Sequence, residues 1–593
     1  MKFPTLPSRQ TMTDFYDIFG GYNHASRIGD NEFFDMKNMA SDGYPLLSPR
    51  KRRGLFKYFD GNPHSIKGMI SKNALCWVEA KNKNLYFYMN GKSYDLGLTA
   101  IPDDDERTLI SMGAYVIIRP DNKYFNTEEE GDMGNIEATF GPIAASFEMT
   151  DINGDGYKSI IHADKAPENP QDLDYWLDNS SKPYTLKQWD ASSGMWVSIA
   201  TTYIRINAAN IAKDFKEGDG VKLSGIPQLP DLDGKISVIQ KAYHAEDTTN
   251  DYIIVVGITD VDFTVLDLTV ERKMPLMDHV IESNNRLWGC RYGLSANGEI
   301  VNELYASKLG DFKNWNVFSG ISTDSYVVSL GSDGLFTGAA SYLGNPVFFK
   351  ENYIHQIYGY FPAQYQVQTT QGRGVQKGSS KSIAVVNETM YYKSNNAVCA
   401  YRGSLPVEIS SVLGDVYYHD AVGAGHNNKY YVSMKDNYNK NHLFVYDTAK
   451  GLWHKEDDVN VLEFCSNREE LYMRTDSDTG LITVFGSGTE EEEEFNWMAE
   501  SGKLGLTAHN KKQLARLSFR MWLAPGARVR LFVEYDSGGS WEQVYVSGMT
   551  NLNSFSVPIR PRRCDHFRIK IEGTGEAKIF SVQKVYEIRS GVK

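Results

Sequence analysis

One pattern recurs between about residues 285 and 486 and limits what this chain can fold into. Each copy is a pair of short runs in which aromatic and β-branched residues alternate with others, joined by a turn rich in Asn, Asp, Lys and Gly. Period-two runs bounded by turn formers predict β-hairpins. The pairs are Asn285–Tyr292 with Asn302–Ala306, Pro346–Lys350 with Tyr353–Tyr358, Met390–Tyr392 with Ala397–Tyr401, Lys429–Ser433 with His442–Asp447, and Glu470–Arg474 with Leu481–Phe485.

Two earlier pairs have the same character, Ala74–Val78 with Asn84–Met89 and Gly113–Ile118 with Lys123–Phe125. A hairpin repeat at roughly 40-residue spacing is typical of a β-propeller. One hairpin cannot bury its apolar face alone, so neighbours must stack. An ordinary β-sandwich of unrelated hairpins is the alternative. The joint recurrence of spacing and aromatic content favours the propeller, with six or seven blades.

The chain has 593 residues, which is too long for one core. We predict an all-β protein, in which a β-propeller carries an inserted β domain and a C-terminal β-sandwich or jelly-roll-like domain. The expected parts are an extended N-terminal arm at 1–56, the first part of the propeller at 57–138, the inserted domain at 139–273, the remainder of the propeller at 274–488 and the sandwich at 495–593. The last part alternates cleanly, as in Leu514–Leu523 and Arg528–Tyr535.

Two charged runs flank the propeller. The basic run Arg50–Arg53 ends the arm, where it either docks on an acidic neighbour or stays a solvated loop. Glu490–Glu494 is a block of like charge, and such a block is by default a solvated loop that separates domains.

The inserted domain begins with Asp151-Ile-Asn-Gly-Asp-Gly156, which resembles the start of a calcium-binding loop. If calcium binds, its ligands would be Asp151, Asn153 and Asp155. The twelfth position should carry a bidentate carboxylate, and here it is His162. The flanking apolar helices are also missing, so a plain Asx/Gly turn is favoured over a metal site, and no other cofactor is expected.

Charge and cysteine usage restrict the classes of partner. The formal net charge of −13 argues against gripping nucleic acid through its phosphates. The five cysteines are scattered within apolar runs without a CxxC pair, which indicates reduced buried thiols and assembly in a reducing cytoplasm. The sequence lacks an apolar signal core and a run of about 18 apolar residues, so no membrane insertion is expected.

A search for catalytic constellations finds no GxSxG, HExxH or GxxxxGK[ST] motif. The acidic residues are too numerous for spacing to select a glycosidase pair. The best candidate for a functional loop is Gln368–Gly374, although a blade-to-blade connection explains it better. We therefore expect no enzyme.

Both ends of the chain resemble a known family. Phe19-Gly-Gly-Tyr-Asn23, Asp35–Met39 and Tyr44–Gly54 are similar to the N-terminus of the tail nozzle, or packaged-DNA stabilisation, proteins of tailed phages, also called tail tubular protein B. Pro525–Arg530, Tyr535–Gly538 and Arg562–Arg568 are similar to the C-terminal β domain of homologues from phages of Gram-positive and gut bacteria.

The resemblance implies a structural protein of the virion tail, made in the host cytoplasm. It would form a homohexameric ring below the portal and adaptor proteins, close the channel after packaging and conduct genomic DNA at ejection. Tail fibres or spikes would attach around it. An acidic lumen would let DNA pass without specific binding. The competing hypothesis is a tail β-propeller that binds or cleaves host-surface glycans, because its many aromatic residues also suit sugar stacking.

Overall fold

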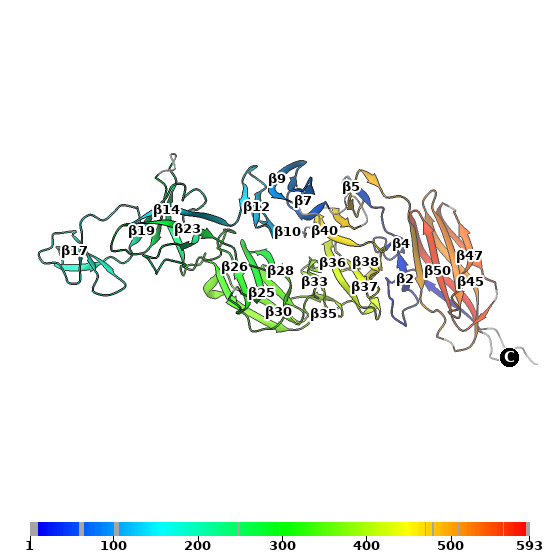
Figure 1. The fold of residues 1–593 in the computed structure, drawn as a ribbon. Coiled ribbons are helices and arrows are strands. Elements are labelled where there is room, and N and C mark those ends of the chain that lie inside the picture. The colour runs from blue at the N-terminus through cyan, green and yellow to red at the C-terminus, as the bar shows by residue number, and fades with distance from the viewer. Residues whose placement is uncertain are drawn as a thin grey trace, which may run out of the picture.

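The structure, a computed structural model, describes residues 10–58, 65–99, 106–245, 250–295, 297–468, 470–476, 480–507, 509–548, 550–560 and 562–588. It is elongated, with four parts in a row (Figure 1): a small sheet at the tip, a barrel, a propeller and a C-terminal sandwich. The described residues contain strands and only three short 3-10 helices, η1 (Pro362–Gln364), η2 (Ser380–Ser382) and η3 (Ser411–Leu413). The predicted all-β class, with a propeller, an inserted β domain and a C-terminal sandwich, is confirmed.

Seven antiparallel sheets form the propeller in the described part of the chain. The first three blades are β6 (Ile66–Ser71), β7 (Leu75–Lys81), β8 (Asn84–Met89) and β9 (Lys92–Thr99); β10 (Thr108–Met112), β11 (Tyr115–Arg119), β12 (Lys123–Asn126) and β13 (Met133–Asn135); and β24 (His279–Ser283), β25 (Arg286–Leu294), β26 (Ile300–Ala306) and β27 (Tyr326–Ser329).

Blades four to six follow without interruption. They are β28 (Phe336–Tyr342), β29 (Asn345–Lys350), β30 (Tyr353–Tyr358) and β31 (Gln366–Gln371); β32 (Ala384–Val386), β33 (Thr389–Lys393), β34 (Val398–Tyr401) and β35 (Val407–Glu408); and β36 (Tyr418–His426), β37 (Lys429–Asp436), β38 (Asn441–Asp447) and β39 (Leu452–Lys455).

Blade seven closes the ring with residues from far apart in the sequence. β40 (Val461–Asn467), β41 (Glu470–Thr475) and β42 (Gly480–Thr483) are joined by β5 (Gly54–Tyr58), and the short β43 (Glu490–Glu491) lies on the outer edge of β5. Most neighbouring innermost strands touch each other, η2 contacts both β28 and β36, and β40 returns to β6. The N-terminal strand β5 therefore fixes the last blade beside the first.

The recurring hairpins of the sequence are the second and third strands of each blade. These strands are buried on both faces because each blade packs between two others; β33, for example, is buried along its whole length. Several of the hairpins open with two consecutive left-handed residues, as at Asn284–Asn285 (φ 53° and 58°) and Asn427–Asn428 (φ 45° and 62°). Asparagine tolerates this conformation best among non-glycine residues, and paired left-handed residues give the tight turn that suits strand twist.

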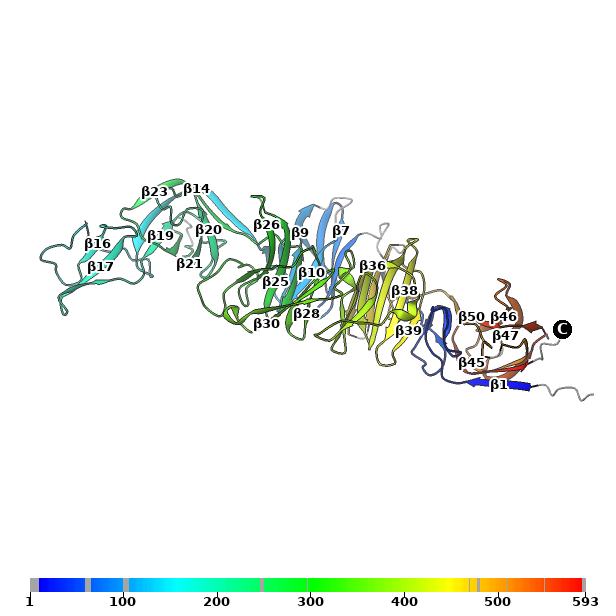
Figure 2. The same cartoon turned by 90° about the horizontal axis from the view of Figure 1, so that it is seen from below.

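The inserted domain lies between blades two and three. It contains a closed barrel around its own apolar core. The barrel strands, in order, are β14 (Ala138–Thr150), β19 (Tyr203–Asn207), β22 (Tyr252–Val256), β21 (Ile236–Tyr243), β20 (Gly220–Ser224) and β23 (Phe263–Arg272). The chain between β14 and β19 forms the tip sheet, which contains β15 (Ile160–Ala163), β16 (Tyr175–Asp178), β17 (Thr185–Asp190) and β18 (Met195–Ser198). β14 and β23 leave the propeller side by side and carry both units away from it (Figures 1 and 2).

The C-terminal sandwich has two five-stranded sheets. One contains β1 (Gln10–Tyr16), β51 (Ala577–Ile588), β45 (Lys512–Leu523) and β48 (Asn551–Pro558), with β49 (Arg563–Cys564) paired to β45. The other contains β2 (Phe33–Lys37), β44 (Asn496–Ser501), β50 (Phe567–Thr574), β46 (Arg528–Tyr535) and β47 (Glu542–Ser547). Burial alternates strictly along β50, as expected of a strand with one face in the core.

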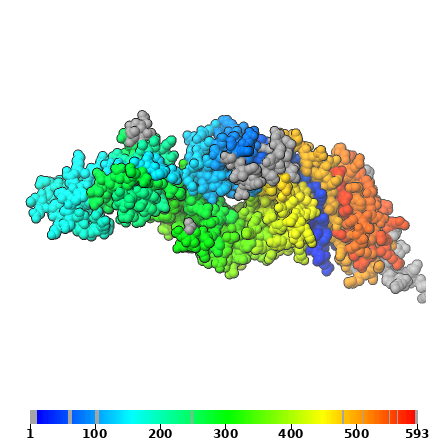
Figure 3. Space-filling view, in the orientation of Figure 1, coloured from blue at the N-terminus to red at the C-terminus, as the bar shows by residue number. Residues whose placement is uncertain are grey.

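The structure corrects the predicted extended arm at 1–56. Residues 1–9 lie outside the described residues, but from Gln10 the segment folds onto its own chain. β1 and β2 add an edge strand to each sheet of the sandwich, the small pair β3 (Met39–Ala40) and β4 (Ser48–Pro49) follows, and β5 enters the propeller. In the space-filling view this segment is a blue band between propeller and sandwich (Figure 3). It pairs here because open sheet edges offer unpaired backbone groups.

None of the helices among the described residues has the length and apolar character needed to cross a membrane.

Candidate functional site

The junction between propeller and sandwich is one continuous apolar core. Phe19, Tyr22 and Phe33 of the N-terminal segment join propeller and sandwich residues in a single buried cluster. The Tyr22 ring lies 5.5 Å from that of Phe444 in blade six, and the Tyr22 amide donates to the Trp453 carbonyl at 2.5 Å. The N-terminal segment therefore fastens two domains that would otherwise be joined by one chain connection.

Parts of the segments that carry the family resemblance lie on one sheet. Asp35 lies on β2, Arg568 on β50 and Arg528 on β46, and these strands are ordered β2-β44-β50-β46. The Arg568 guanidinium lies 5.2 Å from the centre of the Phe34 ring and pairs with Glu534 at 3.1 Å. Segments about 500 residues apart in the sequence thus form one structural unit.

The basic run at the end of the predicted arm docks on acidic residues of the same chain. Arg53 donates to Asp457 at 2.6 Å and to Glu456 at 2.8 Å, and Arg50 holds Glu492 with two hydrogen bonds of 2.6 and 2.8 Å. The glutamate run predicted as a solvated loop is therefore partly structural, because Glu490 and Glu491 form β43 and Glu492 is an ion-pair partner.

We refer to Arg50, Arg53, Glu456, Asp457 and Glu492 as the junction ion cluster. Burial alone would raise the pKa of the Asp457 carboxyl, but Arg53 and then Arg50 hold it below its ordinary value. The same competition, with Arg50 as the dominant cation, lowers the pKa of Glu492. The carboxyls of Asp457 and Glu492 are therefore ionised at neutral pH, and each pairs with a charged guanidinium.

The propeller axis is obstructed by ion pairs. Glu106, just before blade two, pairs with Lys381 of η2 and, at 2.6 Å, with Arg474 of blade seven. The Lys381 ammonium also donates to the Leu462 carbonyl at 3.2 Å. These contacts tie three parts of the propeller together across its centre. Beside them, a cavity of about 520 Å³ is lined by β10, β24, β28 and the start of η2.

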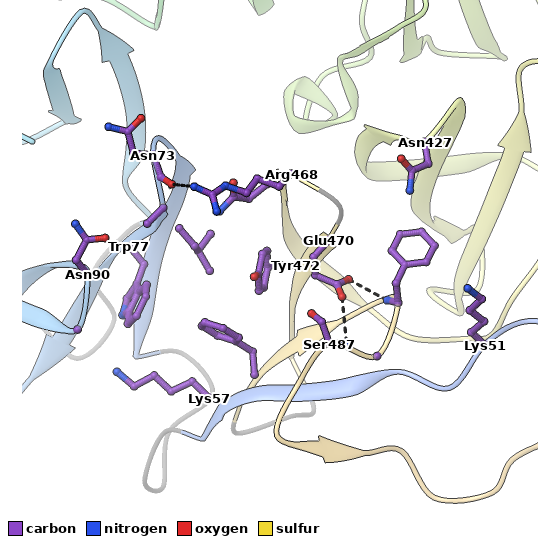
Figure 4. Close-up of a pocket in the computed structure, with 17 residues that line it drawn as sticks. Lys51, Lys57, Asn73, Trp77, Asn90, Asn427, Arg468, Glu470, Tyr472 and Ser487 are labelled. Carbon is purple, nitrogen blue, oxygen red and sulfur yellow. Dashed lines mark hydrogen bonds between the residues drawn. The ribbon is translucent and has the colours of Figure 1, made fainter.

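A larger cavity, of about 1280 Å³, lies where blade seven meets blade one (Figure 4). We call it the seam pocket. Hairpin turns supply its polar rim, including Asn73, Asn90, Asn427 and Arg468, and aromatic residues line its floor. The rim and floor draw on blades one, six and seven together with β5, so the site exists only when the ring is closed.

The seam pocket is cationic although the chain is acidic. Among the described residues that line it, Lys51, Lys57 and Arg468 are basic and Glu470 alone is acidic. Glu470 is only 6% exposed, and its carboxylate accepts the backbone N–H groups of Leu471 and Phe485, each at 2.9 Å. Its charge is thus directed to the backbone rather than to the three cations.

The predicted calcium-loop residues form a compact turn at the start of the insertion. One carboxylate oxygen of Asp151 accepts the backbone N–H groups of Asn153 at 2.8 Å and Asp155 at 2.9 Å. The Asn153 side chain donates to the other oxygen at 3.3 Å. These hydrogen bonds form an Asx turn, the arrangement that the sequence favoured. Across the described residues, no three His, Cys, Asp or Glu side chains gather in a group that could hold a metal ion.

The predicted functional loop Gln368–Gly374 connects blades four and five. Gly374 passes so close to blade four that a Cβ atom there would lie 1.8 Å from the Lys350 carbonyl oxygen. Arg373 pairs with Glu408 at 2.8 Å, and Tyr392 donates to the Arg373 carbonyl at 2.6 Å. The close approach to blade four accounts for Gly374, and the ion pair with Glu408 accounts for Arg373.

Sequence reasoning missed the seam pocket. Its members come from the turns and strands of several hairpins and from β5, and no local motif joins them. The signal present in the sequence was the repeated asparagine at hairpin turns, which turn geometry explains equally well.

Comparisons with known proteins leave the family open. No protein-family model matches the chain, and no curated protein does. Structural similarity is distant. Raptor from Chaetomium thermophilum is 9% identical, with a TM-score of 0.26 over 74% of this chain and 30% of that one. The extracellular domain of the putative one-component system BT4673 from B. thetaiotaomicron is 10% identical, with a TM-score of 0.22 over 91% and 83%. A family 43 arabinoxylan arabinofuranohydrolase from Bacillus subtilis is 9% identical, with a TM-score of 0.17 over 51% and 94%. Likenesses at this level carry no inference about what the chain does.

Proposed function

We propose that this chain is a structural protein of a phage tail, a nozzle subunit that assembles into a homohexameric ring below the portal and adaptor proteins. The proposal rests on one observation: segments from both ends of the chain that resemble the family meet in the fold. Segments from the N-terminus and from the C-terminus both contribute strands to one sheet of the sandwich, in which β44 separates β2 from β50. A resemblance confined to unrelated surface segments would not place them in one structural unit.

The architecture supports a building block. Four β units lie in a row, and the propeller and sandwich share one apolar core. Side-to-side contacts in a ring need subunits that keep their shape, and closed β units supply it. The ion pairs across the propeller axis mean that DNA would pass between subunits, along the axis of the ring, rather than through each propeller.

Single-particle cryo-electron microscopy of the purified chain, alone and mixed with a portal–adaptor complex, tests this role. We expect six-fold rings around an open passage, with more acidic than basic side chains on the lumen so that DNA slides without binding. A chain that stays monomeric in both samples would refute the proposal. A ring with a basic lumen would refute the proposed mode of DNA passage.

Glycan binding is the second candidate function, and the seam pocket is the observation that favours it. The pocket unites aromatic faces, amide side chains and cations in one large cavity. This activity involves no bond cleavage and is compatible with a structural role, because a tail ring is exposed near the host surface.

A further inference from the structure

The seam pocket has the size and composition of a ligand site. Its volume of about 1280 Å³ exceeds the range of roughly 300–1,000 Å³ common for small-molecule sites, so it suits an extended ligand. It is also formed by parts of the fold that meet only on ring closure, which gives it a fixed shape.

The charge of the pocket selects an anion. Lys51 and Arg468 are exposed at its rim, and Arg468 is steadied by a 3.0 Å hydrogen bond from its guanidinium to the Asn73 carbonyl. Lys57 lies inside, with its ammonium 4.6 Å from the Trp77 ring centre and 4.7 Å from that of Tyr88. Charge-assisted hydrogen bonds from such groups to carboxylates are about twice as strong as neutral ones.

The remaining lining suits a hydroxylated ring. Asn73, Asn90 and Asn427 stand on separate turns around the opening, and each amide offers both donors and an acceptor (Figure 4). Phe56 and Tyr472 meet edge to face with ring centres 5.0 Å apart, so they present an apolar wall against which the C–H face of a sugar can pack.

An acidic peptide fits less well. Extended peptides usually bind by adding a strand to an open sheet edge. On the blade-seven side of the pocket, β5 is paired with β42 along one edge, and β43 covers its other edge at Gly54 and Leu55. What the pocket offers is side chains and turns, which recognise hydroxyls and carboxylates rather than a backbone.

We propose that the seam pocket binds an acidic oligosaccharide, with Lys51 and Arg468 holding the carboxylates and the rim asparagines holding the hydroxyls. The proposal does not depend on ring assembly, since every residue of the site belongs to one chain. A hexamer with an inactive pocket, or a monomer that binds the sugar, would separate the two proposals.

The probe is hexagalacturonate, titrated into the full-length chain by isothermal calorimetry at low ionic strength. We expect saturable binding, with Lys51→Gln and Arg468→Gln each weakening it about fivefold, the usual effect of one exposed charge. Ser487→Trp, which places an indole in the cavity without altering charge, should abolish binding. The matched control is Lys165→Gln, an exposed lysine beside the tip sheet, which should leave affinity unchanged. Circular dichroism melts confirm that each variant is folded.

Two further ligands test the specificity. Neutral maltohexaose should bind at least tenfold more weakly, and a hexaglutamate peptide should bind no better than maltohexaose. Equal binding of maltohexaose would show that charge is not recognised, and equal binding of hexaglutamate would show that any polyanion suffices. Either result, absence of hexagalacturonate binding, or full binding by Ser487→Trp would overturn the proposal.

Discussion

Replacing Arg53 by methionine tests whether the junction ion cluster holds the two large domains together. The Arg53 side chain is 8% exposed, and it pairs with Glu456 and Asp457, whose side chains are 5% and 17% exposed. Removing one partner of a buried ion pair typically costs about 3–5 kcal/mol, because the remaining charge stays buried without compensation. Methionine keeps most of the apolar contact of the arginine stem, so the loss reports mainly the charge.

Because Arg50 is also present, we expect the loss of stability in Arg53→Met to lie at the lower end of that range. The guanidinium nitrogens of Arg50 lie 3.7 Å from Asp457 and 3.9 Å from Glu456, so both carboxylates keep a distant cation when Arg53 is lost. We therefore expect about 3 kcal/mol of destabilisation at neutral pH. Urea unfolding followed by tryptophan fluorescence measures it, since Trp453 and Trp497 are buried in the junction core.

The matched control is the neighbouring Arg52→Met. Arg52 is 46% exposed and pairs at 3.8 Å with Glu491, which is 73% exposed, so the expected cost is below about 1 kcal/mol. If Arg53→Met also cost less than about 1 kcal/mol, the cluster would be effectively solvated, and our account of the junction would be wrong.

The effect of pH follows from the sign of the pKa shift. In the native chain, burial raises the pKa of Asp457 and Arg53 lowers it. The net result is a pKa below the ordinary value of 3.8. Such a carboxyl contributes stability above pH 3.8 that is lost as the pH falls through the lower folded value. Without Arg53, burial raises the pKa of Asp457 with less opposition, so this carboxyl is protonated at a higher pH than in the native chain. The free-energy difference between variant and native chain should therefore shrink as the pH falls toward 4 and below.

Four further outcomes are expected. Lys584→Met removes an ammonium that is 1% exposed and bonded to Asp30 at 2.5 Å, so amides of β1 should exchange with deuterium markedly faster than in the native chain. All five cysteines are free and buried, and burial raises the pKa of Cys465 to about 12, so Ellman's reagent should react with none of them until the chain is unfolded. Burial lowers the pKa of His355 from 6.5 to about 4. As the pH falls through this interval, the unfolded chain takes up the proton before the folded chain does, so the free energy of unfolding decreases. His355→Gln should reduce this dependence of the unfolding free energy on pH by up to about 1.4 kcal/mol per pH unit. Millimolar calcium should leave the melting temperature unchanged, because the Asp151 carboxylate already accepts two backbone N–H groups, and a clear rise would instead establish a cation site there.

The second and third strands of each blade could be predicted from the sequence because burial on both faces demands apolar residues along their length. The first and fourth strands could not. The outer strand β31 is largely exposed and carries Gln366, Gln368 and Gln371, so it shows no apolar run. Inner strands such as β28 contain glycine and alanine, since neighbouring blades crowd at the axis; a Cβ on Gly338 would lie 2.8 Å from Ile383. The propeller was visible in the sequence through its middle hairpins alone.

The candidate sites depended on long-range pairing, which local patterns do not encode. The stretch Arg50–Arg53 left open whether it docks on acidic residues or stays solvated, and nothing in it indicates that its partners are Glu456, Asp457 and Glu492 of the same chain. The seam pocket depends likewise on β5 joining blade seven, a pairing between residues more than 400 positions apart.

That pairing makes the two ends of the chain depend on each other. The N-terminal segment supplies β1 and β2 to the sandwich and, a few residues later, β5 to the propeller. Neither domain is complete until the C-terminal half has been made, since β5 needs β42 and β2 needs β44 as partners. Loss of β2 from the sandwich would pull on the same segment that closes the ring of blades and forms the seam pocket. A force applied to either domain is therefore resisted by both, as the proposed role in a ring around DNA would require.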